Sequence, residues 1–374
     1  MISSFSTLGT MKKNMPPISI SLPNQIPSTK MPVVIIGTGS TNTYGYSNDL
    51  TTWTFGTLGT ITNPSSICCG NVNSAPLWVI IGKDNGTTYY STTSTNGTTW
   101  TEPNSSISSI IKAGGWLFNS LNFGYDKDGN GVFLAAGYGG TSGSSSVAIS
   151  SDGTNWVVGG YPFTTTRFAN NCYYGNGYWV VVGNAGSNTN CVMYSTNISV
   201  SGNASITWSN TGRVFTDPGY GVVYSGDRWL IGTRTNPPSS NGILYVSSSS
   251  IPTSIYNTSS TSVGQFPSAI MATQGSAVVG GSGSNNNILY YFNPVTNTTP
   301  TGRVSASTAP SRTWQIEYVS TTTMWIATMA GTSGQNNSIA YSTDAERNAN
   351  IVGWTNISSV NTNIPSCVGI AAAR

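Results

Sequence analysis

The sequence lacks histidine altogether, and charged residues make up only 7% of its 374 residues. Without histidine the chain has neither the commonest general base nor a frequent metal ligand, which excludes Ser–His and Cys–His nucleophile systems. The net charge of +3 includes no basic block beyond Lys12-Lys13. We therefore expect no nucleic-acid partner.

Cysteine and long apolar stretches are scarce as well. The five cysteines are an odd number without CxxC spacing, so we expect reduced, packed thiols and no zinc site. No stretch is long enough to span a membrane, and the N-terminal residues lack the apolar core of a signal peptide. The composition therefore predicts no metal cofactor and no membrane span.

Glycine, in contrast, is abundant, with 43 residues, and it or a small residue closes an apolar run that occurs seven times. Continuous apolar runs are typical of strands buried on both faces. A spacing of roughly fifty residues is the period of a four-stranded propeller blade. The runs cover residues 33–37, 78–82, 132–137, 179–183, 229–232, 277–280 and 325–328.

The two ends of the repeat complement each other. The chain finishes with an inner strand, 367–373, and the repeat starts with a second strand, 33–37, that has no inner strand before it. We therefore predict an all-β fold, a seven-bladed β-propeller of four-stranded antiparallel blades over residues 32–374. The N- and C-terminal strands would close one blade and remove both sheet edges.

Residues 1–31 precede the repeat and contain several prolines. Ile18, Ile20 and Leu22 alternate with serines, which predicts an extended arm. Such an arm either lies along its own domain or adds a strand to a partner's sheet in a larger assembly.

A second repeated feature is a hairpin motif, seen best in Ser150-Ser151-Asp152-Gly153-Thr154-Asn155-Trp156. The Asp or Asn side chain bonds backbone N–H groups ahead of it, glycine takes a positive φ, and tryptophan starts the return strand. The last two of the five copies carry insertions before the tryptophan. The paired residues are Asp49 and Trp53, Asn96 and Trp100, Asp152 and Trp156, Asn197 and Trp208, and Asp344 and Trp354.

These copies resemble the Asp-box, or BNR, repeats of sialidase-type β-propellers, although Gly153 follows Asp152 directly and makes the box one residue short. The resemblance implies a structural role on each blade's outer hairpin. The short boxes and the Asn/Ser/Thr/Gly-rich composition are similar to propellers encoded by large DNA viruses. That likeness implies a virion component or a protein of an extracellular surface.

Catalytic carboxylates are few. A sialidase site needs an arginine cluster, a tyrosine activated by a glutamate, and an aspartate, whereas this chain has three glutamates, Glu102, Glu317 and Glu346. Glu317, beside Tyr318 on a predicted inner strand, is the one tempting residue, and it has no partner carboxylate. We expect no catalytic residues and no enzyme.

A possible calcium loop begins at Asp126 and continues through Asp128 and Asn130. The later ligand positions are occupied by Leu134 and Gly137, which supply no side-chain oxygen. We expect a lengthened polar turn, with calcium as the alternative.

Cations and two tryptophans outside the repeat fall in the linkers between one blade's outer strand and the next blade's inner strand. Such a face suits a glycan or an acidic partner. The alternative is that the arginines hold loops in place and the tryptophans cover the ends of the blades. The residues of this predicted ligand face are Lys112, Trp116, Arg167, Arg213, Arg303, Arg312 and Trp314.

Together these features predict a non-enzymatic structural or interaction propeller that binds protein partners or glycans in a larger assembly. The alternative is a glycan-binding lectin or a degenerate sialidase-like glycoside hydrolase. Equivalent pockets between blades would favour the lectin.

Overall fold

The chain divides into two units, Met1–Lys30 and Met31–Arg374. The predicted arm therefore lies, apart from Met31, outside the described residues. The computed structural model describes residues 31–38, 41–111, 120–138, 146–163, 168–184, 191–200, 206–211, 218–233, 243–247, 252, 255–257, 269–273, 276–281, 287–292, 302–305, 312–320, 322–330, 338–343 and 354–373.

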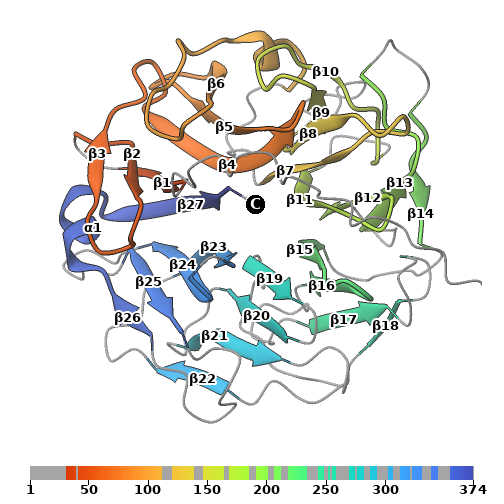
Figure 1. Ribbon diagram of the computed structural model, residues 1–374. Coiled ribbons are helices and arrows are strands. Elements are labelled where there is room, and N and C mark those ends of the chain that lie inside the picture. Colours follow the sequence, from red (N-terminus) through yellow and green to blue (C-terminus); the bar gives the residue numbers. More distant parts are fainter. Residues whose placement is uncertain are drawn as a thin grey trace, which may run out of the picture. The chain divides into compact units, whose positions relative to one another are not determined.

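The second unit is all-β, and its antiparallel sheets are built from strands that follow one another in sequence (Figure 1). Within the described residues, four sheets have four strands each, β7–β10, β11–β14, β15–β18 and β19–β22. A further sheet contains β4–β6, and an eight-stranded sheet contains the remaining strands. The predicted all-β class with four-stranded antiparallel sheets is confirmed.

The elements vary in length because the inner strands are long and the outer strands short. In chain order they are β1 (Val33–Thr38), β2 (Tyr44–Ser47), β3 (Thr54–Gly56), β4 (Asn63–Val72), β5 (Ala75–Lys83), β6 (Tyr89–Ser94), η1 (Ser106–Ser109), β7 (Ser120–Tyr125), β8 (Gly131–Ala136), β9 (Val147–Ser150), β10 (Val157–Val158), β11 (Phe168–Gly175), β12 (Tyr178–Asn184), β13 (Val192–Ser195), β14 (Ser209–Asn210), β15 (Gly219–Tyr224), β16 (Trp229–Thr233), β17 (Ile243–Ser247), β18 (Ile255–Asn257), β19 (Ala269–Thr273), β20 (Ser276–Gly280), β21 (Asn287–Phe292), β22 (Gly302–Ser305), β23 (Arg312–Val319), β24 (Met324–Ala330), β25 (Ile339–Ser342), β26 (Thr355–Asn356), α1 (Ser358–Asn363) and β27 (Ser366–Ala372).

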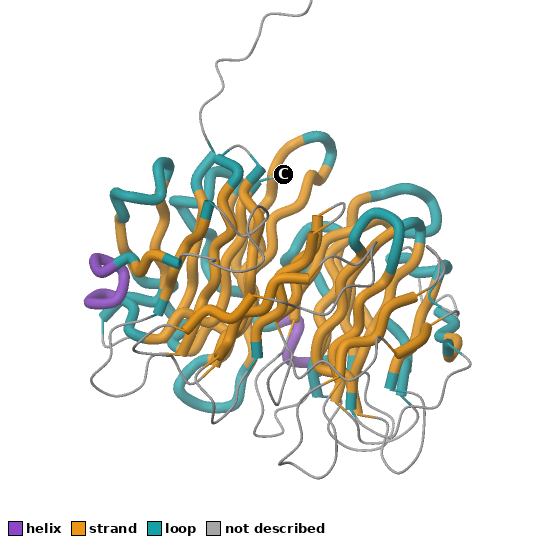
Figure 2. Tube along the Cα trace, turned by 90° about the horizontal axis from the view of Figure 1, so that it is seen from below, coloured by secondary structure: helices purple, strands orange, loops and turns teal. Residues whose placement is uncertain are grey.

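The innermost strands form a closed circuit. β4, β7, β11, β15, β19, β23 and β27 each contact the next in this order, and β27 contacts β4. In Figure 1 the sheets of this unit stand around a common axis, and Figure 2 shows the strands side by side between two layers of loops. The unit therefore has the arrangement of a β-propeller.

The core lies between neighbouring sheets. Val132 and Leu134 of β8 pack with Trp179 and Val181 of β12 in one buried cluster, and similar clusters fill the other spaces. The second strand of each sheet is thus covered on both faces, which is why its sequence is apolar without alternation.

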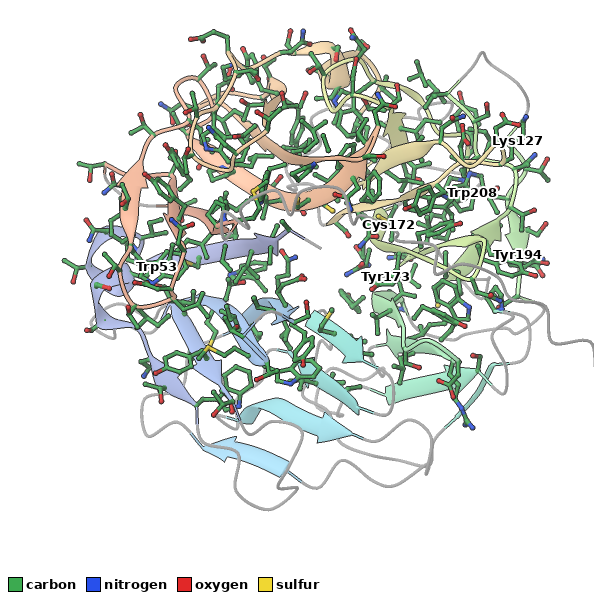
Figure 3. All side chains as sticks on the ribbon, viewed as in Figure 1. Trp53, Lys127, Cys172, Tyr173, Tyr194 and Trp208 are labelled. Carbon is green, nitrogen blue, oxygen red and sulfur yellow. The ribbon has the colours of Figure 1, made fainter. Side chains whose placement is uncertain are left out.

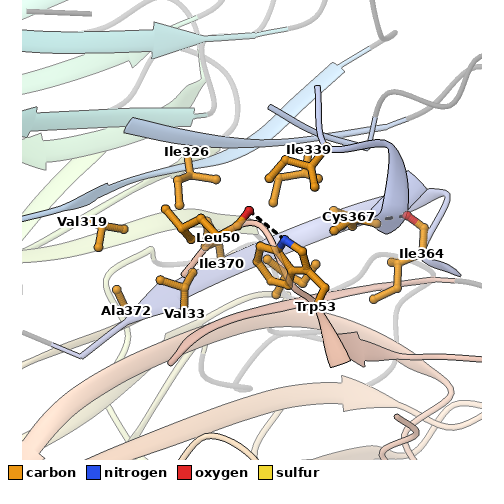
Figure 4. Packing of buried hydrophobic residues seen from close by; sticks show 13 residues of the cluster. Val33, Leu50, Trp53, Val319, Ile326, Ile339, Ile364, Cys367, Ile370 and Ala372 are labelled. Atoms are coloured by element: carbon orange, nitrogen blue, oxygen red, sulfur yellow. Dashed lines mark hydrogen bonds between the residues drawn. The ribbon is translucent and has the colours of Figure 1, made fainter. Parts of the chain in front are cut away.

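The eight-stranded sheet closes the circuit. β27 pairs antiparallel with β1, with Ala372 opposite Val33 and Ile370 opposite Ile35, so the predicted pairing of the two terminal strands is confirmed. This group, β27-β1-β2-β3, joins β23–β26 through a single pair, Ala330 with Ser366. Figure 4 shows the buried cluster between the two groups.

The glycine that closes the second strand lies next to a bulge in the neighbouring inner strand. The register between β11 and β12 shifts between Ala169 and Asn171, next to Gly183. A Cβ on Gly183 would collide with the backbone carbonyl oxygen of Phe168. The repeated glycine is therefore needed because two backbones approach closely.

We predict that Gly183→Ala lowers the free energy of unfolding by roughly 1–3 kcal/mol, because the obstructing atom is backbone and must move. Thermal or urea unfolding of the purified variant measures the change. Gly86→Ala is the matched control, since Gly86 is exposed and only the Asp84 side chain lies near it. Equal losses in both variants would contradict the bulge argument.

Removing residues 366–374 should lower the melting temperature by roughly 10 °C or more, because β1 loses its inner partner and the circuit opens. Differential scanning calorimetry of the shortened and full chains gives the comparison. An unchanged transition would show that the β1–β27 pairing contributes little.

The hairpin motif forms the turn that its residues predict. Asp152 Oδ1 accepts hydrogen bonds from the backbone N–H groups of Thr154 and Asn155 at 2.8 and 2.7 Å. Ser150 Oγ accepts one from the N–H of Gly153 at 2.9 Å, and Gly153 has a φ of 71°. Each side chain thus replaces backbone bonds that the tight turn leaves unmade.

Other copies repeat these bonds. Asp49 and Asn96 each accept from two consecutive backbone N–H groups in their own turns. In the copy with a long insertion, Thr207, the residue before Trp208, still donates to Asn197 Oδ1 at 3.0 Å. The two ends of the turn are therefore preserved in this copy.

The tryptophans of these turns bond to the preceding sheet. Trp156 Nε1 donates to Ser91 Oγ of β6 at 3.0 Å, and Trp208 Nε1 donates to the carbonyl oxygen of Gly159 at 2.9 Å. The turns thus connect one sheet to the one before it. Asp344 of the fifth copy lies outside the described residues.

The tryptophans of the other three copies of the hairpin motif pack against neighbouring side chains. Trp53 is buried with Ile326 between the two halves of the eight-stranded sheet (Figure 4). The ring of Trp100 meets that of Tyr44 edge to face, with centroids 5.8 Å apart. Trp354 packs against the cluster that contains Trp325.

Acid should weaken the Asp152 turn. Burial raises the pKa of Asp152, but hydrogen bonds from Asn155, Thr154 and Ser150 outweigh burial and hold the pKa below its usual value. A lowered pKa in the folded state contributes stability above the unfolded value, near pH 4, and that contribution is lost as the pH falls through the folded value.

We predict that Asp152→Ala costs on the order of 1 kcal/mol at pH 7, because the turn loses its acceptor. Asp152→Asn should cost less, since Asn96 makes the same bonds in its own turn. Unfolding measured from pH 7 to pH 2 should show the wild type losing its advantage over Asp152→Asn below about pH 4. A constant difference across this range would contradict the assignment.

Candidate functional site

A cavity of about 80 Å³ lies on the axis, lined by β4, β7, β11, β15, β19, β23 and β27. A single water needs roughly 10–15 Å³ measured in this way, so the cavity accommodates a small polar molecule or several waters. Figure 3 shows Tyr173, one of its lining residues, near the axis, whereas Trp208 and Lys127 lie at the periphery. We call this space the central cavity.

The lining changes character around the circuit. On β4, β7 and β11 it includes serines and asparagines, and the apolar residues Ile67 and Leu121 of these strands are buried between sheets. On β15, β19, β23 and β27 it includes apolar residues together with Gln315 and Glu317, and several of these apolar side chains are likewise buried between sheets. We call these the polar arc (Ser65, Ser66, Ser120, Asn122, Asn171) and the apolar arc (Val222, Ile270, Met271, Trp314, Ile316, Val368, Ile370).

Glu317 is the one carboxylate among the described lining residues, and it lies on β23 within the apolar arc. Its side chain is buried, with 4% exposed. Along the circuit, β23 is three strands from β7 in one direction and three from β11 in the other. The strand of Glu317 therefore lies opposite the strands of Asn122 and Asn171.

Side-chain hydrogen bonds hold these strands in place. Gln315 Nε2 donates to the carbonyl oxygen of Ile370 at 2.8 Å, and its Oε1 accepts from the N–H of Ile370 at 3.1 Å, so β23 is tied to β27. Ser120 Oγ donates to Asn171 Oδ1 at 3.2 Å. The carboxylate and the amides thus belong to strands that are fixed before any ligand binds.

Asn122 differs from its neighbours. Within the described part of the chain its half-buried side chain makes no hydrogen bond, although it lines the central cavity. An amide in this position offers two N–H donors and one oxygen acceptor to a ligand.

The cysteines are reduced, as predicted, and all five are free. Burial raises the pKa of the Cys172 and Cys367 thiols to about 12. These two thiols therefore stay protonated and are not nucleophiles near neutral pH.

Three residues of the predicted ligand face lie in strands. Trp314 is the extra residue of a bulge between Thr313 and Gln315, and it lines the central cavity. Arg303 and Arg312 belong to strands β22 and β23. The structure thus places these three in strands and not in linkers, because the strands extend further than the composition indicates. Lys112, Trp116, Arg167 and Arg213 lie outside the described residues.

The possible calcium loop makes turn hydrogen bonds. Asp126 Oδ1 accepts from the backbone N–H groups of Asp128 and Asn130 at 2.9 and 2.8 Å. The side-chain amide of Asn130 also donates to Asp126, and Asp128 pairs with Lys127 at 2.7 Å. Among the described residues, no three His, Cys, Asp or Glu side chains gather as a metal site would require.

No described helix has the length and apolar character that crossing a bilayer would require.

No protein-family model matches the sequence, and no curated protein sequence matches it significantly. Solved structures do resemble the fold. A periplasmic gluconolactonase of Pseudomonas aeruginosa is 10% identical, with a TM-score of 0.57 over 92% of this chain and 99% of its own. A putative 6-phosphogluconolactonase of Bacteroides uniformis is 12% identical, with a TM-score of 0.60 over 91% of this chain and 98% of its own.

A second putative 6-phosphogluconolactonase, from Bacteroides fragilis, is 11% identical with a TM-score of 0.55 over 92% of this chain and 98% of its own. At such identities the likeness establishes the fold. It also corrects the expectation of a non-enzymatic structural module that is no enzyme, because the similar propellers are named as lactonases. The expectation was wrong because it relied on the lack of a recognisable catalytic motif, and the absence of a motif is weak evidence against a catalytic site.

Proposed function

We propose that the protein is a hydrolase that opens small esters, lactones in particular, in the central cavity, with Glu317 as the general base. The observation that carries this proposal is the position of Glu317, the one described lining carboxylate, across the circuit from Asn122 and Asn171. The lactonases with a similar fold support the same reaction class. A carboxylate base also suits a chain without histidine.

The reaction needs only water as a second reactant. The Glu317 carboxylate takes a proton from a water molecule, and the water oxygen attacks the carbonyl carbon of the lactone. The carbonyl then re-forms, the ring C–O bond breaks, and the departing oxygen receives the proton from Glu317. The product is a hydroxy acid, and the side-chain N–H groups of Asn122 are the donors for the negative charge on the carbonyl oxygen.

We also infer that the ring has seven blades. The eight-stranded sheet counts as two blades because one residue pair, Ala330 with Ser366, joins its halves.

The hairpin turns support kinship with Asp-box propellers at the level of the repeat, since serine and Asp or Asn side chains make the same bonds in successive turns.

Glu317→Gln should lower the hydrolysis rate of glucono-δ-lactone and of δ-valerolactone at least about 100-fold, because the amide cannot accept the proton from water. A pH-stat follows the acid released at neutral pH, with the spontaneous rate subtracted. Asp152→Asn, on an outer hairpin, is the matched control and should keep full activity. Absence of enzymatic hydrolysis of both lactones in the wild type, or an undiminished rate in Glu317→Gln, would overturn the proposal.

A further inference from the structure

Asn176 and Gly177 make up the whole turn of the hairpin between β11 and β12. Gly175 pairs with Tyr178, so only these two residues separate the strands. Their φ angles are 49° and 79°, in the left-handed region that a two-residue hairpin turn of this kind requires at both positions. Both residues are exposed to solvent. The hairpin therefore presents an Asn-Gly peptide bond at the protein surface.

An Asn-Gly pair is reactive by itself. The backbone nitrogen of the glycine attacks the side-chain Cγ of the asparagine, the bond from Cγ to Nδ2 breaks, and ammonia leaves with the proton of the glycine nitrogen. Water then opens the five-membered imide at either carbonyl carbon, which yields aspartate or isoaspartate. Glycine permits the attack because it has no side chain to obstruct it. The reaction therefore depends on whether the asparagine side chain and the glycine N–H are free to take part.

The turn between β11 and β12 leaves both groups free. Within the described part of the chain, neither the Asn176 side chain nor the Gly177 N–H makes a hydrogen bond. The space around Gly177 is open as well, since a Cβ there would meet no other atom within 4 Å. Water and base therefore reach the nitrogen that attacks.

Three other Asn-Gly pairs lie in the described residues, and the pair in the second hairpin motif is held on both sides. Asn96 Oδ1 accepts hydrogen bonds from the N–H groups of Thr98 and Thr99 at 2.9 and 2.8 Å. The Gly97 N–H donates to Ser94 Oγ at 2.9 Å. The side chain that would have to turn and the nitrogen that would have to attack are thus both engaged.

The remaining two pairs are held by neighbouring aspartates. Asn85 Oδ1 accepts a hydrogen bond from a threonine hydroxyl at 2.9 Å, and the Gly86 N–H donates to Asp84 Oδ1 at 2.8 Å. The side-chain amide of Asn130 donates to the Asp126 carboxylate at 3.2 Å, and the Asn130 carbonyl oxygen accepts from the Asp126 N–H at 2.9 Å. Exposure alone therefore does not make these pairs equivalent to the turn at Asn176.

We propose that Asn176 is a modification site of the folded protein, where the amide is lost to water and an aspartyl or isoaspartyl residue forms. The product adds a negative charge to an exposed turn, and isoaspartate lengthens the backbone of that turn by one methylene group. The change lies at the end of β11, the strand whose residues Asn171 and Tyr173 line the central cavity.

Peptide mapping by mass spectrometry tests this on the full chain. The folded protein is incubated at mildly alkaline pH in heavy-oxygen water and then digested under acidic conditions, so that amides lost during the incubation carry the label. We expect Asn176 to lose its amide at least about tenfold faster than the asparagines of the other three pairs, because their hydrogen bonds must break first.

Two controls separate the effect of the structure from that of the sequence. In the chain unfolded by urea the four pairs should react at similar rates, because each is Asn-Gly. Ser94→Ala removes the acceptor of the Gly97 N–H. This variant should speed the loss at Asn96 by roughly threefold or more and leave the rate at Asn176 unchanged.

A rate at Asn176 no higher than at the other three asparagines of the folded protein would overturn the proposal, and so would the same spread of rates in the unfolded chain. The wild-type comparison decides this even where Ser94→Ala fails to fold. The rates of amide loss are independent of lactone hydrolysis, so the result holds whichever way the test of the proposed function turns out.

Discussion

The pairing of β27 with β1 is the interaction on which the rest of the structure depends. It joins residues at opposite ends of the repeat, and through it the last inner strand contacts the first. Without it, two sheet edges would be exposed and the innermost strands would have no reason to converge. The central cavity exists because the circuit is closed, so closure is a requirement for the site as well as for stability.

Within that circuit, the repeat determines backbone positions and leaves inner-strand side chains free to differ. The bulge at the start of an inner strand recurs on β4, β11, β15 and β23. On β23 the extra residue is Trp314, which lines the cavity, whereas on β11 it is Asn170, whose amide donates to the carbonyl oxygen of Gly219. The same kind of bulge thus links two neighbouring sheets in one place and lines the central cavity in another.

This division explains what could be predicted from the sequence. The apolar runs, their closing glycines and the serine-based turns recur because each repeat must solve the same packing problem, and recurrence is visible in one sequence. Asn122 and Asn171 left no such signal, since a cavity formed by one residue from each repeat has no period. Glu317 attracted notice because it lies beside Tyr318 on a predicted inner strand, in a chain with three glutamates. The position of Glu317 relative to these asparagines depends on the order of the strands around the ring. A pattern along the linear sequence does not give that order.

The burial of Glu317 has a consequence for stability. A carboxylate among hydrocarbon side chains reduces stability relative to an apolar residue of similar size, even when it has a hydrogen-bond partner. The turn residue Asp152, in contrast, stabilises the fold by accepting backbone bonds at the protein surface. Under the proposed function, this loss of stability is the cost of placing a base in the central cavity. The chain has few charges, and under the proposed function the one described carboxylate that lines the central cavity is its base.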